Sequence, residues 1–85
     1  MPLPIAGEAV VTLLDANPVS IHGDLYVDLA MKTGDDEPPT MARVSAHLFP
    51  AVDGVPQCPA AGARLVVRVL LGQIDAVRMA TEDDV

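Results

Sequence analysis

Five side chains have the types that nucleophilic catalysis uses, but their spacing forms no catalytic pattern. The candidates are the hydroxyls of Ser20 and Ser45, the thiol of Cys58, and the imidazoles of His22 and His47. A nucleophile needs a base within reach and a third group that orients this base. Ser45 and His47 share a face of an expected strand, which alone does not indicate a triad. We therefore expect no catalytic residues and no enzyme activity.

Acidic side chains supply possible ligands for a hard cation, without the spacing of a known site. Asp35, Asp36 and Glu37 follow one another directly, whereas the loop of an EF-hand alternates its ligands around a turn glycine. His22 and Asp24 add one imidazole and one carboxylate. Because Cys58 is the single cysteine, it can form neither an intrachain disulfide nor a structural zinc site with other thiolates. We expect a solvated acidic loop, no metal and no cofactor.

The chain is acidic, and its few basic residues are placed regularly. Its formal net charge is −7 over 85 residues. This charge disfavours non-specific contact with DNA or an anionic membrane and favours basic protein partners. The acids gather in expected turns and near position 82, whereas every basic residue falls in an expected strand. These residues are Lys32, Arg43, Arg64, Arg68 and Arg78. The pattern predicts either a mildly basic sheet face or ordinary solvated strand exteriors.

Length and hydropathy indicate one small core and no membrane segment. A chain of 85 residues has material for one hydrophobic core, with no disulfide to stabilise it. Association with a protein partner or with a second copy therefore gains weight. No apolar run approaches the ~20 residues of a membrane span, and no charged and apolar leader opens the chain. We expect a soluble, cytoplasmic protein.

Alternating hydropathy predicts five strands, over residues 9–14, 24–32, 40–49, 63–71 and 74–80. The clearest is 24–32, where apolar residues occupy alternate positions from Leu25 to Met31. The first strand is expected to end at the turn-forming residues 15–18. In the fourth strand Leu71 is expected to point inward, with a turn at Gly72 and Gln73. A hairpin between strands 24–32 and 40–49 is the firmest topological prediction.

The segments outside the predicted strands are expected to be a lead-in, a long loop and a tail. Residues 1–6 carry two prolines and are expected to be an extended lead-in to a single β domain over 7–80. Residues 50–62 contain three prolines and two glycines, which predicts a long loop with at most one helical turn. Residues 81–85 form an expected acidic, flexible tail. Helix content should be low.

The order of the strands resembles an OB-fold. An isolated central hairpin is followed by a loop, and then by residues 61–69, Ala-Gly-Ala-Arg-Leu-Val-Val-Arg-Val, which are similar to the glycine-then-strand step opening the fourth OB strand. The resemblance covers about residues 7–80 and implies a small five-stranded barrel. A small antiparallel β-sandwich is the alternative. In OB-folds that bind nucleic acid, strands two and three present aromatic and basic side chains.

We expect a non-enzymatic interaction module that binds a protein partner or self-associates through a sheet edge or the outward face of strands two and three. Two alternatives stay open: a single-stranded nucleic-acid-binding protein, and an acidic phage-type inhibitor that mimics nucleic acid. The net charge disfavours the first of these and is the support for the second. The candidate binding residues are Tyr26, Lys32, Arg43, His47 and Arg68.

Overall fold

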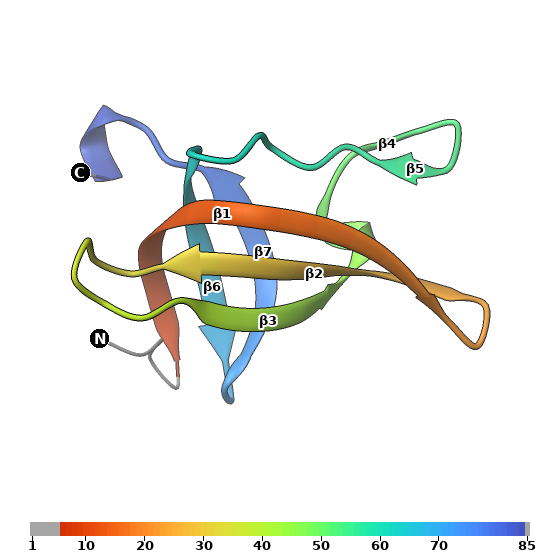
Figure 1. Cartoon of the computed structure of the whole chain (residues 1–85), viewed down its shortest axis with the longest axis horizontal. Coiled ribbons are helices and arrows are strands. Elements are labelled where there is room, and N and C mark those ends of the chain that lie inside the picture. Colours follow the sequence, from red (N-terminus) through yellow and green to blue (C-terminus); the bar gives the residue numbers. More distant parts are fainter. Residues whose placement is uncertain (1–5, 85) are drawn as a thin grey trace.

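The computed structural model describes residues 6–84 and shows an all-β chain (Figure 1). Within that range the secondary structure consists of strands and two short 3-10 turns. The elements are β1 (Gly7–Ile21), β2 (Asp24–Lys32), β3 (Thr40–Ser45), η1 (Ala46–Leu48), β4 (Ala51–Val52), β5 (Val55–Pro56), β6 (Arg64–Leu70), β7 (Gln73–Met79) and η2 (Glu82–Asp84). No helix in the described residues has the length and hydropathy to cross a membrane.

Five strands form one antiparallel sheet in the order β3-β2-β1-β6-β7, which is not closed into a barrel. The predicted hairpin of β2 and β3 is confirmed, with Val27 opposite Val44. The long strand β1 joins two layers, because its residues 7–12 pair with β6 and its residues 12–21 pair with β2. Figure 1 shows β6 and β7 behind β1, β2 and β3 and running across them.

The prediction that the first strand ends before a turn at residues 15–18 is wrong. β1 continues through these residues to Ile21, with a bulge between Leu13 and Asp15. The Asp15 carboxylate accepts hydrogen bonds from the main-chain N–H of Ala16 at 2.9 Å and from the Asn17 amide at 2.8 Å. Beyond Leu13, whose main-chain groups still bond to residues 62 and 63, the ladder pairs β1 with β2 alone, so a strand residue without an N–H, Pro18, is tolerated there. Tertiary pairing outweighs the local turn preference.

Apolar side chains on the concave side of the sheet form the core. The alternation predicted for residues 24–32 is confirmed, because Val27, Leu29 and Met31 have no exposed surface. β1 and β6 supply the opposite layer. The buried core residues are Val11, Leu13, Val27, Leu29, Met31, Val44, Phe49, Leu65, Val67 and Val69.

The third strand is shorter than predicted and does not reach residue 49. β3 ends at Ser45, whose hydroxyl accepts a hydrogen bond from the His47 N–H at 3.2 Å and so begins η1. The turn closes with the Phe49 N–H donating to the Ala46 carbonyl at 3.2 Å. Because η1 breaks the period of two, Phe49 is the buried side chain here, whereas Leu48 is half-buried and packs against the core.

Three two-residue turns join neighbouring strands, and in each both residues have a positive φ, as type I′ hairpins require. They are His22–Gly23, Asp53–Gly54 and Leu71–Gly72. The second turn makes β4 and β5 a small hairpin inside the expected loop 50–62. The third corrects the predicted turn at Gly72–Gln73, and it places Leu71 in solvent, 83% exposed, instead of in the core.

The structure describes part of the expected C-terminal tail and little of the expected N-terminal lead-in. Residues 1–5 of the expected lead-in lie outside the described residues. Within the expected acidic tail, Glu82–Asp84 form η2, and its flexibility stays a prediction. All five basic residues lie in strands, as predicted.

Candidate functional site

Tyr26 and Arg43 are brought together on the outer face of β2 and β3. Tyr26 lies opposite Ser45, and one step further Asp28 lies opposite Arg43. The Arg43 guanidinium donates to both Asp28 carboxylate oxygens, Nε to Oδ1 at 2.7 Å and a terminal nitrogen to Oδ2 at 3.0 Å. These hydrogen bonds lower the pKa of Asp28 and raise the pKa of Arg43. The face therefore carries a neutralised ion pair beside one aromatic ring.

A groove of about 820 Å³ runs along β3 beside this face. One wall is the whole of β3, and the other is formed by Gly72 of the turn before β7 and by the first two residues of β7, Gln73 and Ile74. β3 is an edge strand, because the sheet order pairs it with β2 alone. Met41 on β3 is 68% exposed. An unpaired strand edge beside a groove can add a strand from another chain.

Two of the predicted binding residues lie apart from this pair. Lys32 is at the far end of β2, opposite Thr12 of β1. His47 belongs to η1 and is exposed at a separate hollow of about 510 Å³, which Asp24 and Phe49 also line. The structure therefore does not unite Lys32 and His47 with Tyr26 and Arg43.

Arg68 lies in the other layer of the sheet, on the outer face of β6. It makes a second bidentate ion pair, with Nε 2.8 Å from Asp75 Oδ1 and a terminal nitrogen 2.9 Å from Oδ2. Asp75 is the extra residue of a bulge in β7, since Arg68 pairs with Ala76 and Val69 pairs with Ile74. The contact lowers the pKa of Asp75 and raises the pKa of Arg68. Both arginines of the predicted site thus have carboxylate partners within the chain.

Sequence reasoning missed an apolar pocket of about 520 Å³ at the far end of β7, here named the β7 pocket. Cys58 lines it, and burial raises the pKa of its thiol, which keeps the thiol neutral. Segments far apart in the chain build the pocket, so no local pattern could have revealed it. The lining residues are Leu48, Phe49, Pro50, Gln57, Cys58, Pro59, Ala60, Ala63, Leu65, Val77, Arg78 and Met79.

In residues 6–84 no three His, Cys, Asp or Glu side chains come together as metal ligands. The Ser45 hydroxyl accepts from the main-chain N–H of His47 and so caps η1. Comparisons with models of protein families, with curated proteins and with solved structures find no match to this chain.

Proposed function

We propose that this protein is a non-enzymatic interaction module, which binds a protein partner or self-associates. The observation that supports this proposal is the edge strand β3. It lines a groove along its full length, and the sheet order pairs it with β2 on one side only. Main-chain groups at such an edge supply affinity, while neighbouring side chains supply specificity. Tyr26, Met41 and Arg43 are the side chains that would contact the partner here.

For the fold itself we infer a partly open, OB-like barrel in preference to a sandwich. Support comes from the order β3-β2-β1-β6-β7, in which the first strand lies between the central hairpin and the last two strands. The contact of β3 and η1 with β7 also supports it, since these contacts bring the two sheet edges toward each other. OB-folds use the face of strands two and three for binding.

A protein partner is favoured over a nucleic acid by the two ion pairs. Binding phosphate through Arg43 or Arg68 would compete with Asp28 or Asp75, each held by two hydrogen bonds. The outer face also offers one aromatic ring, Tyr26, where stacking platforms use several. The net charge of −7 acts in the same direction.

The experiment is affinity capture from an extract of the source cells, with quantitative identification of the bound proteins. Tyr26→Ala and Arg43→Ala should each lose the specific partner that the unchanged protein retains. Arg64→Ala on β6 is the matched control, because it removes an exposed arginine from the other layer. Equal capture by all four proteins would contradict the assignment of the β2–β3 face.

A further inference from the structure

β3 is an edge strand that lacks the features by which proteins usually protect such an edge. Those features are a bulge, a proline, an inward-facing charge or a covering segment. β3 has six residues, pairs with β2 without a register shift, and contains neither proline nor glycine. Its charged side chain, Arg43, lies on the outer face and is bound to Asp28. The free edge of β3 is therefore suited to pairing with another strand.

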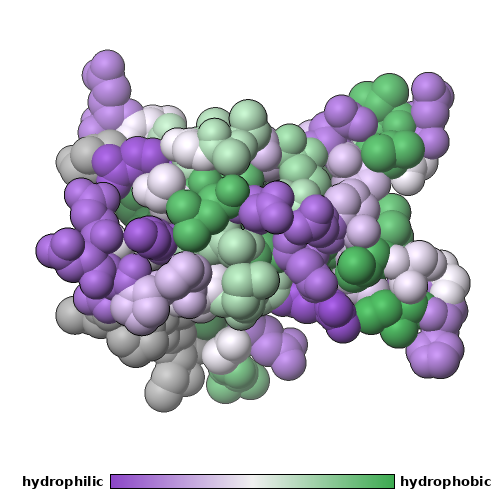
Figure 2. Space-filling view, viewed as in Figure 1, coloured by the Kyte–Doolittle hydropathy of each residue, from purple (hydrophilic) through white to green (hydrophobic). Residues whose placement is uncertain are grey.

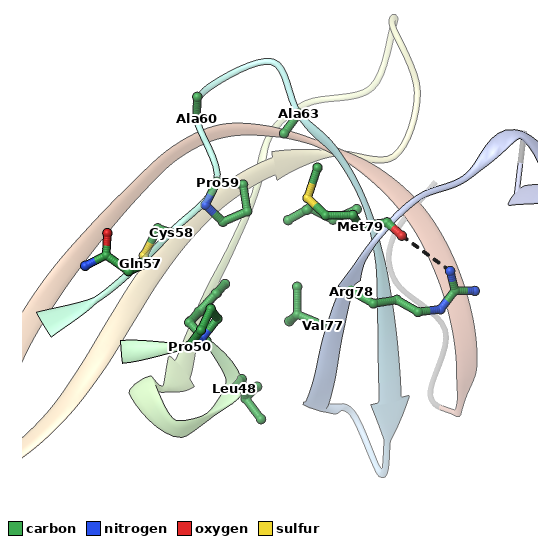
Figure 3. A pocket seen from close by; sticks show the side chains of 12 residues that line it. Leu48, Pro50, Gln57, Cys58, Pro59, Ala60, Ala63, Val77, Arg78 and Met79 are labelled. Carbon is green, nitrogen blue, oxygen red and sulfur yellow. Dashed lines mark hydrogen bonds between the residues drawn. The ribbon is translucent and has the colours of Figure 1, made fainter. Parts of the chain in front are cut away.

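β7, the strand at the other end of the sheet, has an edge that is protected. Asp75 forms a bulge in it, and η1 packs against it. Figure 3 shows Pro50 and Pro59 facing Val77 and Met79 across the β7 pocket. A proline has no N–H to donate to a neighbouring strand. The contrast between the two edges indicates that β3 is the one open to an added strand.

The groove beside β3 has an apolar inner side. Val44 is buried in the core, and Ala42 and Ile74 pack against the same core. Alternate residues of an added strand would therefore contact apolar side chains, while the residues between them would lie beside Met41 and Ser45 on the outer face. Along the six residues of β3 such a strand would extend about 20 Å. The groove thus fits an extended segment in which apolar and polar residues alternate.

Negative charge lies at the end of the groove where β3 begins. The loop 33–39 leads directly into β3, and it carries Asp35, Asp36 and Glu37. Lys32, the last residue of β2, offsets one of these three charges. Figure 2 shows hydrophilic residues at the left margin of the molecule, where Figure 1 places this loop.

The other end of the groove is also acidic. Asp24 is exposed and pairs in register with Ile21, which lines the groove. His47, which the formal charge at pH 7 counts as neutral, lines the adjoining hollow together with Asp24. Between the two ends, Arg43 is neutralised by Asp28. An occupant with basic residues at both of its ends would therefore meet carboxylates at both ends of the groove.

A second copy of this chain does not have that chemistry. Two β3 strands paired antiparallel around a twofold axis would bring loop 33–39 of each copy toward Asp24 of the other, so carboxylates would approach carboxylates. Each copy also carries a net charge of −7. We propose that β3 accepts an extended segment of a different protein, which alternates apolar and polar residues and is basic at both ends. This inference rests on the proposed function and names the chemistry of the partner.

The test uses the full ¹⁵N-labelled chain and two synthetic peptides. Both peptides contain six residues of alternating valine and threonine, and one has two lysines at each end where the other has two glutamates. In the free protein β2 bonds alternate main-chain groups of β3, so the remaining β3 amides should exchange rapidly with deuterium. The lysine-ended peptide should slow this exchange and bind at least about tenfold more tightly than the glutamate-ended peptide. Its affinity should fall as salt is added.

Two results would overturn the proposal. The first is rapid exchange of the β3 amides up to about 2 mM lysine-ended peptide, or equal binding of the two peptides. The second is slow exchange of the same amides without peptide, becoming slower as the protein concentration rises, which would assign the β3 edge to a second copy.

Asparagine variants test the two acidic ends separately. Asp24→Asn and Asp36→Asn should each weaken binding of the lysine-ended peptide about two- to fivefold, because each removes one exposed carboxylate beside the groove. Asp83→Asn is the matched control, since it removes the same charge from η2, after β7. An equal loss in all three variants would show an effect of net charge alone and would overturn the proposal.

Strand addition and the proposed β2–β3 face can fail independently. If the β3 amides exchange rapidly with peptide present while Tyr26→Ala and Arg43→Ala lose their captured partner, the face is supported and strand addition is wrong. If the lysine-ended peptide slows exchange while both alanine variants keep the partner, strand addition is supported and the assignment of the face is wrong.

Discussion

Asp75 protrudes from β7 as a bulge residue and places its carboxylate on Arg68 of β6, with both oxygens accepting hydrogen bonds at 2.8 and 2.9 Å. Asp75 therefore has no paired residue in the β6–β7 ladder, but its side chain is paired with that of Arg68. Asp28 and Arg43 repeat the contact across β2 and β3 without a bulge. Each layer of the sheet therefore carries a neutralised pair of this kind on its outer surface.

The Arg68–Asp75 pair should make stability depend on pH. Arg68 lowers the pKa of Asp75 in the folded state, so the contribution is present above the unfolded value of about 4 and is lost as pH falls through the folded value. Asp75→Asn should reduce the free energy of unfolding at pH 7, and the reduction should shrink as the pH is lowered from 5 to 2.5. Urea unfolding of both proteins at these pH values measures this. Asp36→Asn, in an exposed loop, is the control.

Relief of the strained turn should stabilise the monomer. Leu71→Asn places a residue that tolerates φ 53° at a position where leucine gains no burial, so the free energy of unfolding should rise by about 1 kcal/mol. Urea unfolding of both proteins measures it. A lower stability for Leu71→Asn would show that the leucine contributes to its own fold.

Leu13 and Leu14 are adjacent at the β1 bulge, and their replacement by alanine should change the free energy of unfolding by different amounts. Leu13 has no exposed surface and lies in the core, whereas Leu14 is 37% exposed. Leu13→Ala should lower the free energy of unfolding by about 2–5 kcal/mol. Leu14→Ala should lower it by less than about 1 kcal/mol. Thermal unfolding followed by circular dichroism compares them, and equal losses would contradict the bulge position.

A short single-stranded oligonucleotide should not bind the β2–β3 face. In an amide NMR titration at low salt, the resonances of Tyr26 and Arg43 should not shift. The reason is that the Arg43 guanidinium already donates hydrogen bonds to Asp28 and is not available to a phosphate. Shifts on these residues that disappear as salt is added would instead favour the nucleic-acid alternative.

Cys58 should react slowly with a thiol reagent such as DTNB. Burial raises the pKa of its thiol, so the reactive thiolate is scarcer at pH 7 than in an unfolded chain. Adding urea beyond the unfolding midpoint should accelerate the reaction.

Part of the fold follows from local pattern. Strict alternation determines β2, since one face of residues 24–32 must be buried, and the polar loop 33–39 allows β2 and β3 to pair as a hairpin. The Val-rich run of β6 and the low helix content also follow from residue types. These features depend on neighbours in the chain, which the sequence displays directly.

Predictions based on turn-forming residues are wrong where pairing with a distant strand outweighs the local preference for a turn. Asp15, Asn17 and Pro18 favour a turn, but pairing with β2 holds them extended. Gly72 marks the last turn, yet strand register decides that Leu71 and not Gln73 accompanies it. A shift of one residue there moves a side chain from the core to solvent, because side chains alternate along a strand.

The sequence by itself determined that this chain is all-β, acidic and built around one aliphatic core, because composition and period two act locally. The tertiary structure decided which charges meet. It gave Arg43 and Arg68 their carboxylates through strand register, and it joined residues 48–60 with β7 into an apolar pocket. Contacts of this kind depend on which distant strands become neighbours, and that follows from packing of the whole core rather than from any single segment.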